Sequence, residues 1–377
     1  MSQAELVRES DLLHAAVREF ARGGGGPTRF AEIALELARF QARRSPRFAR
    51  LVALSGRPLD RVDAIPAVPA DAFRMARVAV HPAELDAVRF TTSGTTAAER
   101  GTHALRTTET YRELALAGAR AALFAPGARY TIVALAPALS EPPSSSLGFM
   151  LAAFMEHFDG RGLDGEPTPA RSDERWLLGP RGVGLAALER AAGVARRRGE
   201  PLVVLATSLA LDALLEALGG RPLALPAGSF VMQTGGSKGQ KRVVDPVELR
   251  RRAARALSIP EPAIVSEYGM TELSSQLYDC ARSGLERSGQ AGVFVPPPWL
   301  QVTPVDPVTL EPVPVDSVGL ARFVDLGNVD SAVAVVTRDR VRRRGAGIEL
   351  LGREPGAPPR GCSLAVEALL DGGGDGL

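Results

Sequence analysis

The strongest constraint on the fold of this 377-residue chain is an alternation of strand, helix and strand in its middle. Leu202–Ala206 is a short apolar run typical of a buried strand, Ala210–Leu218 has the composition of a helix, and Ser229–Thr234 is a second strand candidate. Tyr130–Leu135 is a further one. Short apolar strands that alternate with helices predict a mostly parallel sheet with helices on its faces. The predicted fold class is therefore α/β.

Helices are predicted on the N-terminal side of this alternation. The first forty residues read as two amphipathic helices separated by residues 23–27, a glycine-rich stretch that ends in proline. Thr107–Phe124 reads as a further helix, with Thr110 and Glu113 spaced like a capping box. The N-terminal pair is expected to lay one apolar face on the core.

Two further stretches carry structural signals. Ser144–Ser146 is either the start of a helix over Leu147–Phe158 or a second polar lining of a site, and the helix start is the favoured interpretation. Residues 293–339 are rich in Pro and Val, with short β runs at Leu320–Leu326 and Ala332–Thr337. These runs predict a small β subdomain.

Composition argues against several classes of protein. The formal net charge is +2, and the arginine runs contain no interleaved aromatic residues, so solvated faces are favoured over a nucleic-acid interface. The only two cysteines, Cys280 and Cys362, form neither a disulfide framework nor a zinc pattern and fit a reducing compartment. No secretory signal is evident, and no apolar run approaches the roughly 18 residues that a membrane span needs. We expect a soluble, cytoplasmic protein.

A run of hydroxyl residues and glycine points to an anion site. Phe90–His103 reads F-T-T-S-G-T-T-A-A-E-R-G-T-H, in which Thr92–Thr96 has no bulky side chain. Such a run does not build a core, and its glycine lets the backbone come close to a ligand. Backbone N–H groups and hydroxyls would converge on phosphate oxygens, with Arg100 and His103 adding charge or polarity.

Two polar or glycine-rich turns follow predicted strands, where ligands gather in parallel sheets. They are Gln233–Gly239 and Ser266–Ser274. Gly235–Gly239 also matches the G-x-S-x-G nucleophile elbow, but all four histidines precede Ser237, so no base follows it in the order that the hydrolase fold requires. Neither lysine completes a Walker motif.

Taken together, these turns resemble the motifs of the adenylate-forming superfamily of acyl- and aryl-CoA ligases, adenylation domains and luciferases. T-T-S-G-T-T resembles its phosphate loop, and Y-G-M-T-E at Tyr268–Glu272 matches its Y-G-x-T-E, in the same order and about 170 residues apart. Thr234–Gly236 stands where the family has a glycine turn, and Thr337–Asp339 resembles T-G-D, with Arg338 in place of glycine. Gly352–Arg353 resembles its hinge.

The resemblance implies a role for each matched residue, with ATP and Mg²⁺ as cofactors. Thr271 would contact the α-phosphate, Glu272 would bind Mg²⁺, and Arg100 would replace the lysine of the usual phosphate loop. Asp339 would hold the ribose, and Arg353 would belong to the hinge. The phosphate cradle would comprise Thr92, Ser93, Gly94, Thr95 and Thr96, and the adenine side would comprise Gly235, Gly236, Tyr268 and Gly269.

Within the superfamily, the chain is most similar to the LuxE-type acyl-protein synthetases. The likeness rests on Ile65–Arg74, on P-P-S-S-S-L-G-F-M, on T-G-G-x-K-G and on R-G-C-S-L at Arg360–Leu364. Cys362 lies in a loop flanked by glycine and proline and close to Arg360, a cation that would favour its nucleophilic thiolate. It is the expected acyl carrier, whereas Cys280, in a predicted helix, is the expected structural thiol.

The resemblance also implies a domain plan. Residues 1–350 would form a large adenylate-forming-enzyme-like domain with α/β sheets and the small β subdomain, and this domain would include a helical preface over residues 1–60. Residues 351–377 would hold the hinge and a truncated C-terminal lid segment carrying Cys362. The expected substrate is a carboxylic acid, with a fatty acid favoured, and the expected partner is an acyl acceptor such as an acyl-CoA-reductase-like protein or a carrier protein. An acyl- or aryl-CoA ligase and an inactive adenylate-binding module stay open as alternatives.

Overall fold

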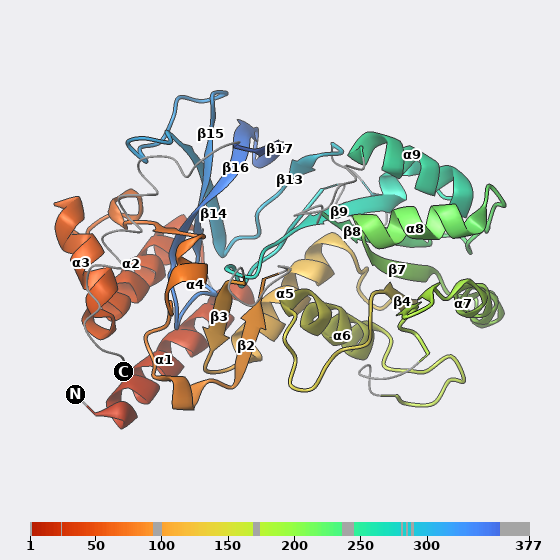
Figure 1. Cartoon of the computed structure of the whole chain (residues 1–377), viewed down its shortest axis with the longest axis horizontal. Helices are drawn as coiled ribbons and strands as arrows, with labels where there is room; N and C mark the ends of the chain where they lie inside the picture. The colour runs from red at the N-terminus through yellow and green to blue at the C-terminus, as the bar shows by residue number, and fades with distance from the viewer. Residues whose placement is uncertain are drawn as a thin grey trace. The chain divides into compact units, whose positions relative to one another are not determined.

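The computed structural model describes residues 2–23, 25–92, 100–168, 174–235, 245–279, 282–283, 286–287 and 290–354. The chain divides into two compact units. Unit 1 comprises Met1–Ala117, Met270–Gln276 and Val295–Leu377, and unit 2 comprises Gly118–Gly269 and Leu277–Phe294. Figure 1 labels helices and many of the strands of both units.

Unit 2 is built on the parallel sheet that the sequence predicted. Strands β4 (Thr131–Leu135), β7 (Leu202–Thr207), β8 (Phe230–Thr234) and β9 (Ile264–Tyr268) lie side by side in this order and run parallel. The short strand β10 (Leu277–Tyr278) pairs antiparallel with β9. All residues of β4 and β8 are buried, as expected for strands covered on both faces.

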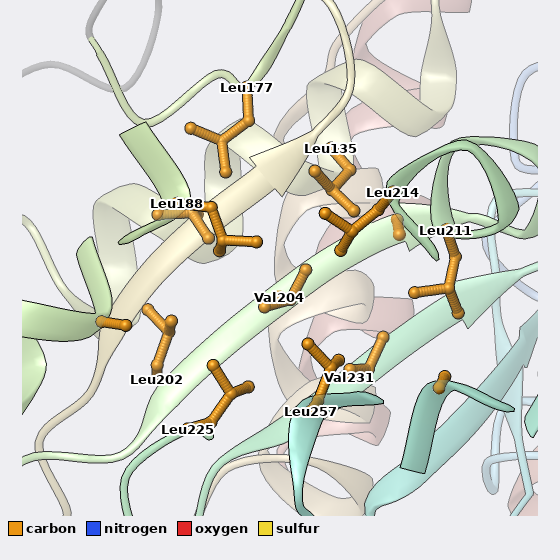
Figure 2. Packing of buried hydrophobic residues seen from close by; sticks show 14 of the residues in the cluster. Leu135, Leu177, Leu188, Leu202, Val204, Leu211, Leu214, Leu225, Val231 and Leu257 are labelled. Atoms are coloured by element: carbon orange, nitrogen blue, oxygen red, sulfur yellow. The ribbon is translucent and has the colours of Figure 1, made fainter. Parts of the chain in front are cut away.

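Helices pack on this sheet because successive side chains of each strand point to opposite faces. On one face, side chains of α7 (Leu185–Arg198), α8 (Ser208–Leu218) and α9 (Pro246–Leu257) form an aliphatic core with the strands. Figure 2 shows this core around Val204, Val231 and Leu214. Phe230, the neighbour of Val231, contacts a separate aromatic group made by Phe124, Tyr130, Phe154 and Phe158.

The favoured interpretation of the triple serine is confirmed. Helix α6 spans Ser146–Phe158, and the Ser145 hydroxyl accepts a hydrogen bond from the Gly148 N–H at 3.0 Å as its N-cap. Unit 2 also contains two short antiparallel strand pairs. One consists of β5 (Leu178–Gly179) and β6 (Gly182–Val183), and the other of β11 (Arg282–Ser283) and β12 (Glu286–Arg287). Strand β13 (Val293–Phe294) comprises the last two residues of unit 2 along the chain.

Unit 1 begins with the predicted pair of amphipathic helices. Helix α1 spans Gln3–Ala21, with a capping box between Ser2 and Glu5, and α2 spans Pro27–Arg44. The apolar side chains of α2 recur at helical spacing and are buried: Phe30, Ile33, Ala34, Leu37 and Phe40. Shorter helices follow at α3 (Pro46–Ser55) and α4 (Ala72–Met75), and α5 (Glu109–Ala122) ends in unit 2.

The predicted β region of unit 1 is a larger sheet than expected. Strands β14 (Leu300–Val305), β15 (Val318–Asp325), β16 (Ala334–Arg344) and β17 (Gly347–Arg353) pair antiparallel in sequence order. Strand β1 (Val68–Pro69) joins this sheet parallel to β16, so the proline-rich Ile65–Arg74 stretch supplies one of its strands. A separate hairpin consists of β2 (Val88–Thr91) and β3 (Thr102–Leu105).

Two local predictions were wrong. Thr110 does not cap a helix: α5 begins at Glu109, and the Thr110 hydroxyl lies 2.8 Å from Nδ1 of the buried His14. The helix expected before Cys280 is also absent at Leu277–Tyr278, which form β10, while Cys280 itself lies outside the described residues. At Thr110 a long-range contact replaced the local preference, and at Leu277–Tyr278 pairing with β9 did so.

The predicted boundary at residue 350 falls within β17, and residues 355–377 lie outside the described residues, so the hinge and the truncated lid segment stay predictions. Among the helices in the described ranges, none has the length and apolar content that would let it cross a bilayer.

Candidate active site

Two predicted nucleotide-binding turns lie at the same edge of the unit 2 sheet. Gly235 directly follows β8 and Tyr268 ends β9, and the register pairs Thr234 of β8 with Glu267 of β9. Both turns therefore lie at the carboxyl edge, where ligands of parallel sheets bind. The Tyr268 ring is half-buried against Phe294, with 6.2 Å between the ring centroids. Gly236 lies outside the described residues.

A network of side chains holds this edge in place. The Ser208 hydroxyl, at the start of α8, lies 2.6 Å from Oε1 of Gln233 and 3.1 Å from the Thr234 carbonyl. The Gln233 amide donates to the Ser266 hydroxyl at 3.1 Å and so links β8 to β9. Gly235 is exposed, and a Cβ there would meet no described atom within 4 Å, which leaves room for a ligand against its backbone.

Glu267 is a titratable group that the sequence analysis did not single out. Its side chain is buried at the end of β9, and burial raises its pKa to about 7, although a hydrogen bond with Thr234 acts in the opposite direction. A carboxyl group within the apolar run I-V-S-E-Y was the signal in the sequence. This carboxyl group lies beside the predicted adenine turn.

On unit 1, the predicted phosphate loop connects β2 to β3. Thr92 is half-buried, and its hydroxyl accepts a hydrogen bond from the Gly101 N–H at 2.8 Å, which closes the base of the hairpin. Arg100 is exposed. Outside the described residues lie Ser93, Gly94, Thr95 and Thr96. The structure therefore describes only Thr92 of the predicted phosphate cradle, and the cradle stays a prediction.

Asp339 and Arg353, which are distant in the motif pattern, are neighbours in the unit 1 sheet. The register pairs Asp339 of β16 directly with Arg353 of β17, with Asp339 half-buried and Arg353 exposed. The Asp339 N–H donates to the Thr337 hydroxyl at 3.0 Å, so two residues of the T-R-D motif are joined. Arg338, which replaces the glycine of the family, donates to the Glu354 carbonyl at 2.8 Å.

The last three residues of Y-G-M-T-E belong to unit 1. The segment Met270–Gln276, here called the motif segment, contains Thr271, which is half-buried, and Glu272, which is buried. His103 was expected to add charge or polarity at the phosphates. It is instead buried, and its Nδ1 lies 2.7 Å from the Thr271 carbonyl. Burial lowers the pKa of His103 to about 4, so the ring is neutral near pH 7.

The donors available for Mg²⁺ fit an ion held mainly by a nucleotide. Among the described residues, no three His, Cys, Asp or Glu side chains gather as a metal site. Mg²⁺ in phosphate-transfer sites often takes one or two protein carboxylates, with phosphate oxygens and water for the rest. Glu272 is therefore compatible with the predicted role, and a fully protein-bound Mg²⁺ site is not indicated in these parts of the chain.

The fold has counterparts among solved structures. The chain is similar to 2-hydroxyisobutyryl-CoA ligase in its open conformation with 2-HIB-AMP and CoA, with a TM-score of 0.59 and 12% identity over 87% of this chain and 76% of the ligase. The same ligase in its postadenylation state with 2-HIB-AMP gives a TM-score of 0.59 at 12% identity, covering 87% of this chain and 68% of the ligase. Its thioesterification state gives 0.55 at 13% identity, covering 94% and 69%.

No protein-family profile matches the sequence, and no curated protein matches it. At 12–13% identity, the structural likeness establishes the fold and nothing finer. The chain therefore has the mixed α/β fold of the adenylate-forming ligases, as the motifs predicted. Cys362, Arg360 and Cys280 lie outside the described residues, and the roles of the site residues stay predictions.

Proposed function

We propose that this protein is an ATP-dependent ligase that activates a carboxylic acid, most simply a fatty acid, as an acyl-adenylate. The acyl group then passes to Cys362 and on to an acceptor protein, either an acyl-CoA-reductase-like partner or a carrier protein. The observation that carries the proposal is that the turns at Gly235 and Tyr268, which match two superfamily motifs, follow adjacent parallel strands. The shared ligase fold supports it.

In the first step, a carboxylate oxygen of the acid attacks the α-phosphorus of ATP, and pyrophosphate leaves. The protein contributes positioning and charge in such a reaction, because there is little covalent chemistry for it to perform. The proposal assigns the adenine to the turns at Gly235 and Tyr268, the ribose to Asp339 and the phosphates to the β2–β3 loop with Arg100. Glu272 would hold Mg²⁺, which neutralises phosphate charge when it is bound.

In the second step, the Cys362 thiolate attacks the acyl carbonyl, a thioester forms, and AMP leaves. A thiolate is the nucleophilic form of cysteine, and the neighbouring Arg360 favours it. Transfer to the acceptor would exchange this thioester for a new ester or thioester on the partner and would regenerate the thiol. The resemblance of R-G-C-S-L to LuxE-type synthetases supports this step.

A second candidate is an acyl- or aryl-CoA ligase in which Cys362 plays no part. It is favoured by the likeness to 2-hydroxyisobutyryl-CoA ligase, which was solved with CoA as well as 2-HIB-AMP. In that case CoA attacks the adenylate directly. The alternative that is not an enzyme is an inactive adenylate-binding module.

One experiment separates these candidates. Exchange of labelled pyrophosphate into ATP is measured with a panel of fatty and aryl acids, and acid-dependent exchange is the expected result. With the best acid in radiolabelled form, wild-type protein is expected to keep the label after denaturation, and Cys362→Ser to lose its thioester while Cys280→Ser keeps it. Exchange without protein labelling, followed by label transfer to CoA, would favour the second candidate, and no exchange with any acid would leave the binding module.

A further inference from the structure

The motif segment is held by polar contacts from distant parts of unit 1. Of its seven residues, Glu272 and Leu273–Gln276 are buried. The Leu273 N–H donates to the Met270 carbonyl at 3.1 Å, and this turn leaves the carbonyls of Thr271 and Glu272 pointing to other partners. Each of these two carbonyls receives a hydrogen bond from one side chain, His103 or Asn328.

In its neutral form, the His103 ring can make its contacts in one tautomer only. Nδ1 lies 2.7 Å from the Thr271 carbonyl, which is solely an acceptor, so Nδ1 carries the proton. Nε2 of the neutral ring is then an acceptor and receives the Ser331 hydroxyl at 2.8 Å. The ring also packs edge-on against Phe73, with 5.5 Å between centroids. The imidazole is therefore fixed in both orientation and tautomer.

Asn328 holds the next residue in the same way. Its Nδ2 donates to the Glu272 carbonyl and to the Ala332 carbonyl, at 2.9 Å each, and its Oδ1 accepts from the Ser274 hydroxyl at 2.8 Å. Asn328 is fully buried, so a substitution that removed either donor contact would leave a buried carbonyl without its hydrogen bond from Asn328.

Asp325 completes the contacts at the C-terminal half of the motif segment. Its carboxylate accepts from the Ser274 N–H at 2.8 Å, from the Ser275 hydroxyl at 2.7 Å and from the Gly327 N–H at 2.9 Å. The run Asp325–Ser331, which begins at the last residue of β15, thus supplies three side chains that bind the motif segment or His103.

We propose that His103 and Asn328 are positioning residues for adenylation: they fix the backbone of Thr271 and Glu272, and so aim the two side chains that would contact the α-phosphate and Mg²⁺. The proposal rests on the proposed function for those two side chains. Catalytic groups must be held within about 0.5 Å of their working positions by supporting hydrogen bonds. Two consecutive carbonyls held by two buried side chains meet this requirement.

The tautomer of His103 tests the geometry without any ligand. The protein has four histidines, so ¹⁵N-histidine labelling gives a small set of imidazole signals, and their comparison with the His103→Asn variant assigns one of them. At pH 7.5 we expect this ring to be the neutral Nδ1–H tautomer. The neutral Nε2–H tautomer at this position would overturn the proposal.

A matched pair of substitutions tests the role. Asparagine places an amide near Nδ1 and can still donate to the Thr271 carbonyl, whereas glutamine places its amide near Nε2 and cannot. Titration calorimetry with ATP and Mg²⁺ is expected to show affinity about tenfold weaker for His103→Gln, because the Thr271 carbonyl loses its donor. Affinity within about threefold of wild type is expected for His103→Asn and Ser331→Ala, which keep a donor to this carbonyl. With EDTA in place of Mg²⁺, the difference in ATP affinity between His103→Asn and His103→Gln should become smaller.

The outcomes separate the two proposals. If wild-type protein binds ATP with Mg²⁺ and the Asn and Gln variants bind equally well, the positioning role is wrong and the proposed function survives. If wild-type protein binds no ATP, the proposed function fails and the positioning role fails with it. A lower melting temperature of His103→Gln together with an ATP affinity equal to that of His103→Asn would mean that His103 has a merely structural role.

Discussion

Gly327 shows how closely a single residue is fitted around the motif segment. A Cβ at this position would lie 2.7 Å from Cδ1 of Leu114, 2.7 Å from Cβ of Ser274 and 3.1 Å from Oδ1 of Asp325. Leu114 has a flexible end, but the Cβ of Ser274 is fixed by the hydrogen bonds that its N–H and hydroxyl make. Glycine is therefore required here for lack of space, and its conformational freedom plays no part.

We expect Gly327→Ala to destabilise unit 1 by about 1–3 kcal/mol, the usual cost of forcing extra volume into a packed site. The two tryptophans allow the measurement, because Trp299 lies in unit 1 and Trp176 in unit 2. Urea unfolding is followed by Trp299 fluorescence in a Trp176→Phe background. Gly26→Ala is the control, since a Cβ there meets no described atom within 4 Å. Equal midpoints for the two variants would contradict the packing argument.

At the scale of the elements, helix α9 is joined to the unit 2 sheet by a buried ion pair as well as by apolar contacts. Arg250 on α9 donates to Asp279 at 2.5 Å, to the Ser266 hydroxyl at 2.9 Å and to the Ile264 carbonyl. Asp279 is fully buried and also accepts from the Ser266 N–H at 2.5 Å and the Gly292 N–H at 2.8 Å. This cluster ties the helix to the start and middle of β9, the strand that ends at Tyr268.

Removing the cation of this cluster should be costly. We expect Arg250→Met to destabilise unit 2 by about 3–5 kcal/mol, because it leaves Asp279 buried without its partner. Arg251, the next residue on α9, is the matched control: it pairs with Glu248 at the surface, so Arg251→Met should change the unfolding midpoint only slightly. Trp176 fluorescence in a Trp299→Phe background reports the result. Similar midpoints for the two arginine variants would show that the buried pair contributes little.

For the chain as a whole, two buried groups make stability depend on pH in opposite directions. Burial raises the pKa of Glu267 in unit 2 from 4.5 to about 7, and lowers the pKa of His103 in unit 1 from 6.5 to about 4. Between pH 4.5 and 7, the unfolded Glu267 is ionised while the folded one keeps its proton, so this stability is complete below pH 4.5 and lost as the pH rises to 7. The stability associated with neutral His103 is complete above pH 6.5 and lost as the pH falls to 4.

We therefore expect the two units to respond oppositely between pH 5 and pH 7, by up to roughly 3 kcal/mol each. Glu267→Gln should remove the Glu267 contribution from the pH dependence reported by Trp176, and His103→Asn should remove the His103 contribution reported by Trp299. Chemical unfolding at several pH values measures both. An unchanged pH dependence of unit 2 in Glu267→Gln would mean that this carboxyl titrates normally.

Features that have a short period or a compact motif could be predicted from the amino-acid sequence alone. Apolar runs at Tyr130–Leu135, Leu202–Ala206 and Ser229–Thr234 predicted parallel strands, and the structure confirms them as β4, β7 and β8. The same reasoning placed the turns at Gly235 and Tyr268 at one edge, because parallel strands end on the same side of their sheet. Ser145 at the start of α6 also has a local cause, the unpaired N–H groups of a helix N-terminus.

The packing of distant segments in the fold determines which polar groups meet inside the protein. His103 and Thr271 are 168 residues apart, and Asn328 and Glu272 are 56 apart, and no periodic pattern links such pairs. The same reason explains the error at Thr110, whose hydroxyl meets His14 across 96 residues instead of capping its own helix. A buried polar group must find a hydrogen-bond partner wherever the chain brings one, so its partner depends on the packing of the entire fold and cannot be seen in a local stretch of sequence.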